Sequence, residues 1–304
     1  MSEAKVSRQS GVVQCRQGAR RSAGATHPGY RREQNEDAYW ADEQRGVWVV
    51  ADGLGGHHAG ELASKTVVEE IQHSSATDRH YEQALRKAHT LLLGDEHCTA
   101  NMGSTAVVLA EEGDYFRIYW VGDSRAYLWA PGGGNGELSQ LTNDHSYVQM
   151  LMDSGAINSE EAASHPNRHV ITRCIGGSAN PNLEIDRVSY QWAAGQKLLL
   201  CSDGLCTEVP NEKIAQILAE NADNHRAVDL LIGAALDAGG RDNITVQIID
   251  APPQAPALRS TPDSAAVHNK PLSGQFQRLS KRTFAALLVL AAVTMAVIGL
   301  PKLL

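Results

Sequence analysis

Acidic residues stand at the ends of separate apolar runs in this chain of 304 residues. Glu36 and Asp37 belong to the segment NED, the runs VVAD and LLLCSD end in Asp52 and Asp203, and Asp242 in GRDNITV stands just before an apolar run. Carboxylate oxygens are the ligands that Mg²⁺ and Mn²⁺ prefer in proteins. Short Asp side chains at strand ends can converge on one point, so the pattern predicts a single cluster of oxygen ligands. Two-metal phosphoryl-transfer chemistry requires such a cluster.

Glycine directly follows two of these acids, in VVADG and LLLCSDG. Glycine permits a sharp turn and lets a backbone carbonyl approach an ion. A single Asp-Gly pair is most often a plain turn. The prediction of a metal site therefore depends on the motifs taken together.

The composition is that of a packed globular protein, with 42% hydrophobic and 20% charged residues. A formal net charge of −8 leaves no basic excess for a phosphate backbone, so nucleic acid is excluded as an expected partner. The five cysteines form no C-x-x-C pair and lack zinc spacing, and the N-terminus lacks a secretory signal. These features favour reduced thiols in the cytosol.

Period-two and period-three-to-four patterns predict alternating strands and helices. The expected strands are 46–53, 104–110, 115–123, 124–130, 197–204 and 243–250, and the expected helices are 58–72, 80–94, 147–154, 211–220 and 225–239. The tight turn VGDSR (121–125) predicts antiparallel pairing of the strands around it, because parallel strands need a long crossover. We expect sheets packed together with helices outside.

The composition changes after Asp250. Residues 251–282 are rich in Pro, Ser and Ala, which predicts a disordered linker. Residues 283–300 carry no charge and approach the ~20 residues that cross a bilayer, which predicts a transmembrane helix rather than a buried core helix. Basic residues lie mainly before this helix, as Arg278, Lys281 and Arg282 against Lys302 in the tail 301–304. The positive-inside rule then predicts a tail anchor with the large domain in the cytoplasm.

Ordered motifs across the chain resemble those of the metal-dependent Ser/Thr protein phosphatases of type 2C, the PPM class. They are T-x-x-G-x-x-R-x-x-N-E-D (26–37), DGLGG (52–56), GSTA (103–106), VGDSRAY (121–127), LTNDHS (141–146), ITRCIG (171–176), CSDGL (201–205) and GRDNITV (240–246). The resemblance covers about residues 12–250, after a flexible N-terminus at 1–11. It implies an α+β fold, the PPM-type α/β/β/α sandwich of two packed antiparallel sheets flanked by helices, to which the C-terminal transmembrane helix is added.

The same resemblance implies a role for each matched residue. Metal ligands would be Glu36, Asp37, Asp52, the Gly53 carbonyl, Asp203 and Asp242. In this assignment Asp52 bridges two Mn²⁺ or Mg²⁺ ions and Asp37 acts largely through bound water. Asp123 would hold a third, weaker ion together with Asp203, and its alternative role is a strand-turn cap.

Two further residues take roles beside the ions. Arg32 would bind the substrate phosphate, since a guanidinium fork matches phosphate oxygens. Asn243 would support the metal site, with an N-cap or turn role as the open alternative. Eukaryotic relatives carry a histidine at the position of Leu54, proposed to protonate the leaving group, so the general acid is unassigned here. His57 and His58 are expected to face solvent at a helix start.

The implied activity is hydrolysis of phosphoserine and phosphothreonine on cytoplasmic proteins by a metal-activated water, opposing a Ser/Thr protein kinase at the cytoplasmic membrane. Residues 146–170 would form a mobile flap near the mouth of the site, where His165 and Arg168 can meet substrate. One alternative is a membrane-tethered pseudophosphatase that only binds. Another is a metal phosphoesterase for small molecules or other phosphoresidues, because function belongs to the site rather than the fold.

Overall fold

The computed structural model describes residues 21–55, 58–94, 102–177 and 182–257. Contacts divide the chain into two units, Met1–Leu258 and Arg259–Leu304, and the described residues all belong to the first. The predicted flexible N-terminus and the predicted transmembrane helix at 283–300 lie outside them. Within the described ranges, none of the helices is long and apolar enough to cross a membrane.

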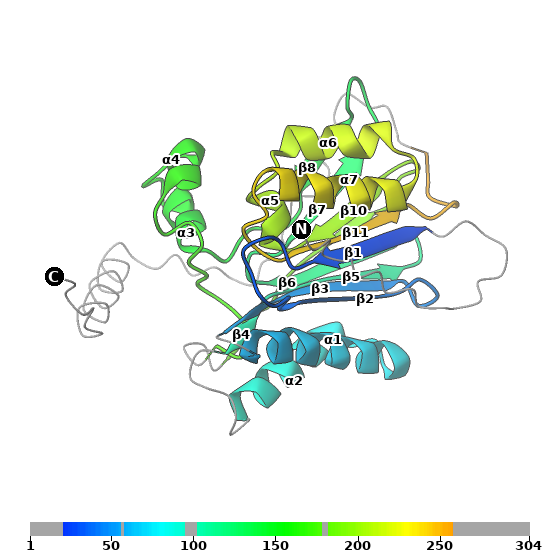
Figure 1. The fold of residues 1–304 in the computed structure, drawn as a ribbon. Coiled ribbons are helices and arrows are strands. Elements are labelled where there is room, and N and C mark those ends of the chain that lie inside the picture. The colour runs from blue at the N-terminus through cyan, green and yellow to red at the C-terminus, as the bar shows by residue number, and fades with distance from the viewer. Residues whose placement is uncertain (1–20, 56–57, 95–101, 178–181, 258–304) are drawn as a thin grey trace. The chain divides into compact units, whose positions relative to one another are not determined.

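Two antiparallel sheets pack face to face (Figure 1). The five-stranded sheet has the order β1 (Ser22–His27), β11 (Ile244–Asp250), β10 (Lys197–Cys201), β7 (Arg125–Ala130) and β8 (Glu137–Gln140). The six-stranded sheet has the order β2 (Asp37–Asp42), β3 (Val47–Leu54), β5 (Ala106–Glu112), β6 (Tyr115–Val121) and β9 (Asp186–Gln191), and β4 (Gly103–Ser104) pairs with the end of β3.

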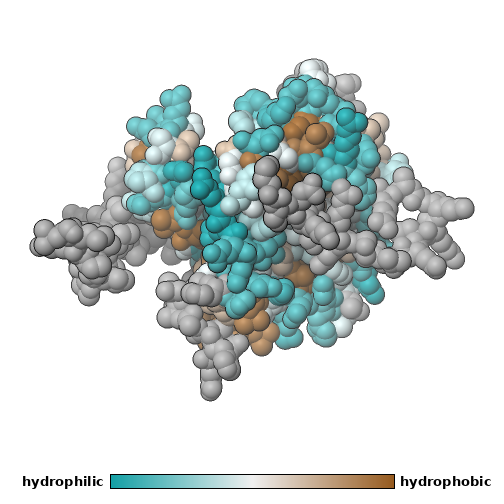
Figure 2. All heavy atoms as spheres, in the orientation of Figure 1, coloured by the Kyte–Doolittle hydropathy of each residue, from teal (hydrophilic) through white to brown (hydrophobic). Residues whose placement is uncertain are grey.

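Helices cover the outer faces of both sheets. The six-stranded sheet carries α1 (Ala59–Thr77) and α2 (Tyr81–Gly94), and the five-stranded sheet carries α6 (Asn211–Glu220) and α7 (Asn224–Asp237) (Figure 1). The short α5 (Asp203–Cys206) follows β10, while α3 (Tyr147–Asp153) and α4 (Ser159–Ser164) stand beside the sandwich. Figure 2 shows a mostly hydrophilic face with small apolar patches, as expected when the apolar stripe of each helix is buried. The predicted α/β/β/α sandwich is confirmed.

Both faces of the central strands are buried, which explains their unbroken apolar runs. In β3, Val47, Val49 and Ala51 pack against α1 and α2. Trp48 and Val50 alternate with them and pack between the sheets, with Trp48 fully buried. The sandwich therefore has three apolar layers, and the acidic strand ends emerge at the edge of the middle one.

The prediction that the strands around VGDSR pair with each other is wrong. β6 and β7 belong to different sheets, and both edges of β6 are already paired, with β5 and β9. The chain crosses between the sheets at Gly122, whose φ of 99° favours glycine and where a Cβ would lie 2.6 Å from the Thr105 side chain. Asp123 consequently stands at the junction of the two sheets.

Two boundaries and several elements also differ from the predictions. The strand predicted to reach residue 204 ends at Cys201, and α5 begins at Asp203. Residues 251–257, predicted to be linker, lie against the sheet, because the amide of Ala251 donates to the Gln196 carbonyl at 2.8 Å. The predictions also omitted β1, β2, β8, β9 and α4.

Candidate metal centre and active site

A cleft of about 440 Å³ opens where the motif-bearing turns of both sheets meet. Its lining includes the predicted site residues Arg32, Glu36, Asp52, Gly53, Asp123, Asp203, Asp242 and Asn243. Residues separated by more than two hundred positions in the chain are thus brought to one cavity. Asp37 does not line the cleft and lies behind Asp52.

Asp37 and Asp52 are direct cross-strand partners on β2 and β3. One carboxylate oxygen of Asp37 accepts hydrogen bonds from the hydroxyls of Ser202 at 2.8 Å and Thr245 at 2.6 Å. The other oxygen is buried without a partner among the described residues. Burial raises the pKa of Asp37 to about 7. The two hydroxyls, which the sequence analysis missed, fix this carboxylate behind the cleft and leave one oxygen for a further ligand.

The GSTA motif holds Asp52 in place. The hydroxyl of Thr105 accepts the Asp52 amide at 3.0 Å, and the Thr105 amide donates to the Asp52 carbonyl at 2.8 Å. The same hydroxyl is 2.7 Å from that of Ser124, next to Asp123. Burial, followed by Asp37 and Asp203, raises the pKa of Asp52 well above its ordinary value. One threonine therefore ties Asp52 to the turn that carries Asp123.

Both Asp-Gly glycines are required by close backbone approach. A Cβ on Gly53 would lie 2.1 Å from the carbonyl oxygen of Gly60, where α1 begins. A Cβ on Gly204 would lie 2.0 Å from the carbonyl oxygen of Asn243. A residue with a side chain does not fit at either position, so these two glycines allow the chain segments of the site to come into contact.

Arg32 is paired with Asp242 in the cleft. The guanidinium nitrogen lies 2.7 Å from one Asp242 oxygen, and this hydrogen bond raises the pKa of Arg32. The Arg32 side chain is 50% exposed. It therefore balances part of the acidic charge and remains accessible to an anion entering from solvent.

Asn243 cross-links the loop that carries Arg32 and Glu36. Its amide oxygen accepts the Glu36 backbone N–H at 2.8 Å. Its amide nitrogen donates to the carbonyls of Pro28 at 3.0 Å and Gln34 at 2.9 Å. With three bonds to one loop, Asn243 serves that loop rather than capping a helix, since the strand β11 follows it.

Asp203 and Asp123 also line the cleft and complete its acidic cluster. Burial and the nearby Asp242 raise the pKa of Asp203 to about 6. Burial and Asp203 raise the pKa of Asp123 well above its ordinary value. Asp123 is only 6% exposed, and one of its oxygens is buried without a partner in the described part of the chain. A bound cation would offset the repulsion among these carboxylates.

The residues fit Mn²⁺ or Mg²⁺, although their side chains do not yet converge. Among the described residues, no three His, Cys, Asp or Glu side chains stand at ligating positions around one point. The Asp242 oxygen faces Arg32 instead. The hard oxygen donors, the unpartnered buried oxygens of Asp37 and Asp123, and the mutual charge repulsion match what a hard divalent cation would satisfy.

The predictions for the histidines are confirmed in part: His58 is exposed at the start of α1, as predicted, whereas His165 does not line the cleft. Leu54 lines the cleft, and His58 is exposed, 3.7 Å from Glu61, while His57 lies outside the described residues. His165 accepts the Asn167 amide at 3.1 Å and does not line the cleft. The flap instead contributes Arg168 and His169 to the lining, and His169 was not predicted. A histidine in an irregular loop gives no periodic signal, so sequence reasoning had no means of placing it.

The family model described as protein phosphatase 2C matches residues 24–235. The chain belongs to this family. The matched residues include the loop of Arg32 and Glu36, both strands of the Asp37–Asp52 pair, and Asp203. The two packed antiparallel sheets with their flanking helices are thus the protein phosphatase 2C fold.

Named relatives of this phosphatase family are bacterial Ser/Thr phosphatases. The Ser/Thr protein phosphatase PstP of Mycobacterium tuberculosis is 35% identical over 245 residues, which is 76% of this chain and 45% of PstP, so the match spans less than half of that relative. The Ser/Thr phosphatase Stp of Listeria monocytogenes is 33% identical, over 74% of this chain and 93% of Stp. A crystal structure of the PstP catalytic domain in complex with two manganese ions has a TM-score of 0.67 at 33% identity, covering 76% of this chain and 97% of that one.

Proposed function

We propose that this protein hydrolyses phosphoserine and phosphothreonine in proteins with two Mn²⁺ or Mg²⁺ ions at the acidic cluster. The observation that carries this proposal is the single cleft that Asp52, Asp123, Asp203 and Asp242 all line beside the exposed guanidinium of Arg32. Family membership supports it, as do the named phosphatase relatives and the two manganese ions of the PstP structure.

The residues of the cleft divide the work. The carboxylates of Asp52, Asp203 and Asp242 and the Gly53 carbonyl would hold the ions, with Glu36 beside them and Asp37 behind. When bound, such ions supply Lewis acidity and a water activated at neutral pH. Arg32 can leave its single bond to Asp242 and present two N–H groups to a phosphate dianion. The flap residues Arg168 and His169 close the outer wall of the cleft.

Phosphate release from a phosphothreonine peptide tests the activity. The full-length protein is assayed with Mn²⁺, Mg²⁺ or EDTA, beside Asp52→Asn. We expect metal-dependent turnover that falls about 10³-fold or more in the variant. The reason is that the metal ions stabilise the transition state by several kcal/mol, and each 1.36 kcal/mol lost lowers the rate about tenfold. The matched control is Asp114→Asn, an exposed aspartate in the β5–β6 turn that does not line the cleft.

The alternative functions give different results in the same assay. If the wild-type protein binds Mn²⁺ yet releases no phosphate with any of the metals, it is a binding module, as the pseudophosphatase hypothesis predicts. A protein that cleaves small phosphomonoesters but leaves phosphopeptides intact would be a small-molecule phosphoesterase. Either result contradicts the proposal.

We further propose that the enzyme is tail-anchored in the cytoplasmic membrane with its catalytic domain in the cytoplasm, where it opposes a Ser/Thr protein kinase. The support is the uncharged segment 283–300 and the basic residues before it. Deleting residues 259–304 leaves the unit Met1–Leu258 whole. The shortened protein should keep its hydrolysis rate and move from the membrane pellet to the soluble fraction, and continued pelleting would refute the anchor.

The kinase role has its own test. Cells that lack this protein should accumulate phosphothreonine on cytoplasmic proteins, and the wild-type chain should reverse this accumulation. Asp52→Asn should not. Unchanged phosphothreonine levels in such cells would remove the support for a kinase-opposing role.

A further inference from the structure

His145 holds the turn that carries Asp123 from two directions. Its backbone N–H donates to the Gly122 carbonyl at 3.0 Å. Its ring nitrogen Nδ1 accepts the Gly122 amide, also at 3.0 Å. Gly122 immediately precedes Asp123, whose carboxylate lies in the cleft. The His145 side chain is 8% exposed and stacks on Trp120 with ring centroids 6.2 Å apart. The ring is therefore held in a fixed position inside the protein and does not face solvent.

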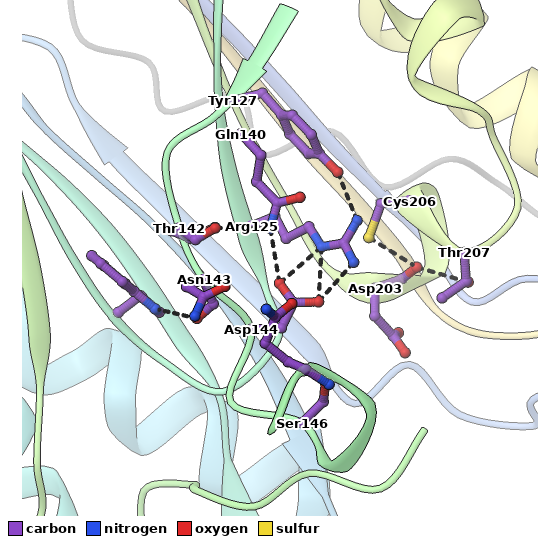
Figure 3. A network of polar contacts seen from close by, with 12 residues as sticks. Arg125, Tyr127, Gln140, Thr142, Asn143, Asp144, Ser146, Asp203, Cys206 and Thr207 are labelled. Carbon is purple, nitrogen blue, oxygen red and sulfur yellow. Dashed lines mark hydrogen bonds and ion pairs between the residues drawn. The ribbon is translucent and has the colours of Figure 1, made fainter. Parts of the chain in front are cut away.

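The residues next to His145 hold the other side of the same turn. Asp144 accepts three hydrogen bonds of 2.7–3.0 Å from the guanidinium of Arg125, which also donates to the Tyr127 hydroxyl at 2.9 Å (Figure 3). The hydroxyl of Thr142 accepts the Ala126 amide at 3.2 Å. Both flanks of Asp123 are thus tied to one short segment, residues 142–146. The position of this carboxylate depends on where that segment lies.

The segment 142–146 is also the base of the flap. The flap starts at Ser146, and a β-bridge pairs Ser146 with Ile171 at its end. The Tyr147 amide donates to the Val170 carbonyl at 2.8 Å, and the Thr172 amide donates to the His145 carbonyl at 2.8 Å. The chain therefore leaves and re-enters the sandwich at His145, and the flap residues of the cleft wall extend from this base.

The far end of the His145 ring contacts Asp186, the first residue of β9. Because Nδ1 accepts the Gly122 amide, the ring proton resides on Nε2, which donates to Asp186 at 3.3 Å. This hydrogen bond lowers the pKa of Asp186. Arg173, just after the flap, donates to the other Asp186 oxygen at 3.1 Å and pairs with Glu184 at 3.1 Å. The Arg173 nitrogen also lies 3.1 Å from Nε2, but two N–H groups cannot bond each other, so Asp186 joins them.

We propose that His145 is a positioning residue that couples the flap, residues 146–170, to the carboxylate of Asp123. Its Nδ1 end sets the Asp123 turn, and its Nε2 end sets the return of the flap through Asp186 and Arg173. A change in flap position then changes the geometry of the acidic cluster, and an ion at Asp123 changes the flap in return, because coupling between two sites is reciprocal. The coupling rests on the proposed function only in taking the acidic cluster as the metal site.

Two variants separate the two ends of the ring. In His145→Asn the short amide reaches the place of Nδ1 but not Asp186, and in His145→Gln the longer amide reaches the place of Nε2. Asp186→Asn replaces the carboxylate that accepts from both Nε2 and Arg173 with an amide that has a single acceptor oxygen, so it breaks the link between them. It leaves the imidazole in place and lies on a partly exposed side, so it tests the coupling even if a His145 variant fails to fold. His58→Gln, at an exposed histidine away from the cleft, is the matched control.

Two measurements on the full-length protein read the coupling without relying on turnover. Calorimetric titration with Mn²⁺ identifies the binding event that Asp123→Asn removes. Trypsin cleavage after the exposed Arg168, followed by mass spectrometry of the released peptides, reports the flap. In the wild type we expect occupancy of the Asp123 event to slow this cleavage several-fold.

The variants should lose different halves of this behaviour. His145→Gln should weaken the Asp123 event at least tenfold. His145→Asn and Asp186→Asn should keep the Mn²⁺ affinity of the Asp123 event within about threefold but abolish the slowing of cleavage after Arg168. A residue that only stabilises the fold would not separate these two effects. Wild-type Mn²⁺ affinity and wild-type protection in all folded variants would overturn the coupling. If the wild type shows the coupling but releases no phosphate, the proposed function is wrong and this inference is still supported.

Discussion

Two arginine–aspartate pairs lie on either side of Asp203, and they differ in how completely the protein satisfies them. Arg32 meets Asp242 through a single hydrogen bond of 2.7 Å, and its side chain is 50% exposed. Arg125 meets Asp144 through three hydrogen bonds, with the two side chains 25% and 10% exposed (Figure 3). Arg32 and Asp242 are 210 residues apart in the chain, whereas Arg125 and Asp144 are 19 residues apart.

The difference separates a site for binding from a structural cross-link. The Arg125–Asp144 pair is saturated and shielded, so a ligand could displace it only at a large cost. The Arg32–Asp242 pair lies in a solvent-open cleft and uses one hydrogen bond from the guanidinium, so a phosphate could replace Asp242 at Arg32 and a cation could replace Arg32 at Asp242. The same two residue types thus serve opposite purposes because of burial and bond number.

Breaking the buried pair should have the largest effect. Arg125→Met leaves Asp144 buried without its cation, which should lower the free energy of unfolding by about 3–5 kcal/mol in urea denaturation. Restoring neutrality with Arg125→Met/Asp144→Leu should recover part of that loss. A single variant that loses less than about 1 kcal/mol would show that the buried pair is no more important than a surface ion pair.

The metal-free cleft should become less stable as pH rises. Folding raises the pKa of Asp37 to about 7 and of Asp203 to about 6, above the ordinary value near 3.9. A carboxyl with a raised folded pKa contributes its stability below pH 4 and loses it as pH rises through 6 and 7.

The pH effect is measured by thermal unfolding in EDTA. The melting temperature should fall by roughly 5 °C or more between pH 5 and pH 8, equivalent to about 2 kcal/mol. Excess Mn²⁺ should flatten this slope because the ions balance the charge, and Asp37→Asn should reduce it. A slope that is identical with and without Mn²⁺ would place its origin outside the cleft.

Removing the exposed arginine should affect activity and not stability. Arg32→Ala should lower kcat/KM for a phosphothreonine peptide about 10- to 100-fold, because a bidentate charge-assisted contact to phosphate is lost. Stability should change by less than about 0.5 kcal/mol. Arg31→Ala, at the exposed neighbour that does not line the cleft, is the control. Equal losses in the two variants would mean general attraction and not a specific contact.

The smallest effect is expected from Arg32→Lys. The ammonium keeps the charge but not the planar fork, so kcat/KM should fall only about three- to tenfold, with most of the change in KM. A loss as large as that of alanine would show that the guanidinium geometry outweighs its charge.

The pattern of apolar runs was sufficient to predict the central strands and the layered fold. The central parts of β3, β5 and β10 are buried on both faces, so their sequences are continuously apolar. β6 and β11 are mostly buried and mostly apolar, interrupted by Arg117 and by Thr245 and Gln247. β1 was omitted because its residues are small and weak strand formers. Its Ala23 and Ala25 are buried in the apolar cluster beneath α6 and α7, and β1 pairs with β11, which comes from the opposite end of the domain. β9 alternates half-buried and exposed residues at an edge and gives a weaker signal.

The acidic residues of the cleft were found in the sequence because each follows a strand or turn signal, and family resemblance ordered them. Their partners were not. Ser202 and Thr245 acquire their role from Asp37, which is separated from both by more than 160 residues and touches them only in the fold. The pairing of Arg32 with Asp242, and the link from Thr105 to Ser124, likewise depend on which turns the sheets bring together.

The sequence by itself determined which residues bring carboxylate oxygens to the cleft, where the strands end beside them, and which phosphatase family the chain resembles. These are local properties, set by residue type, apolar period and turn chemistry over a few positions. Only the tertiary structure decided that β6 and β7 lie in different sheets, that Asp123 stands at their junction, and that His145 joins this junction to the flap. The physical reason is that strand partners and buried hydrogen bonds are chosen by long-range packing, which no local pattern encodes.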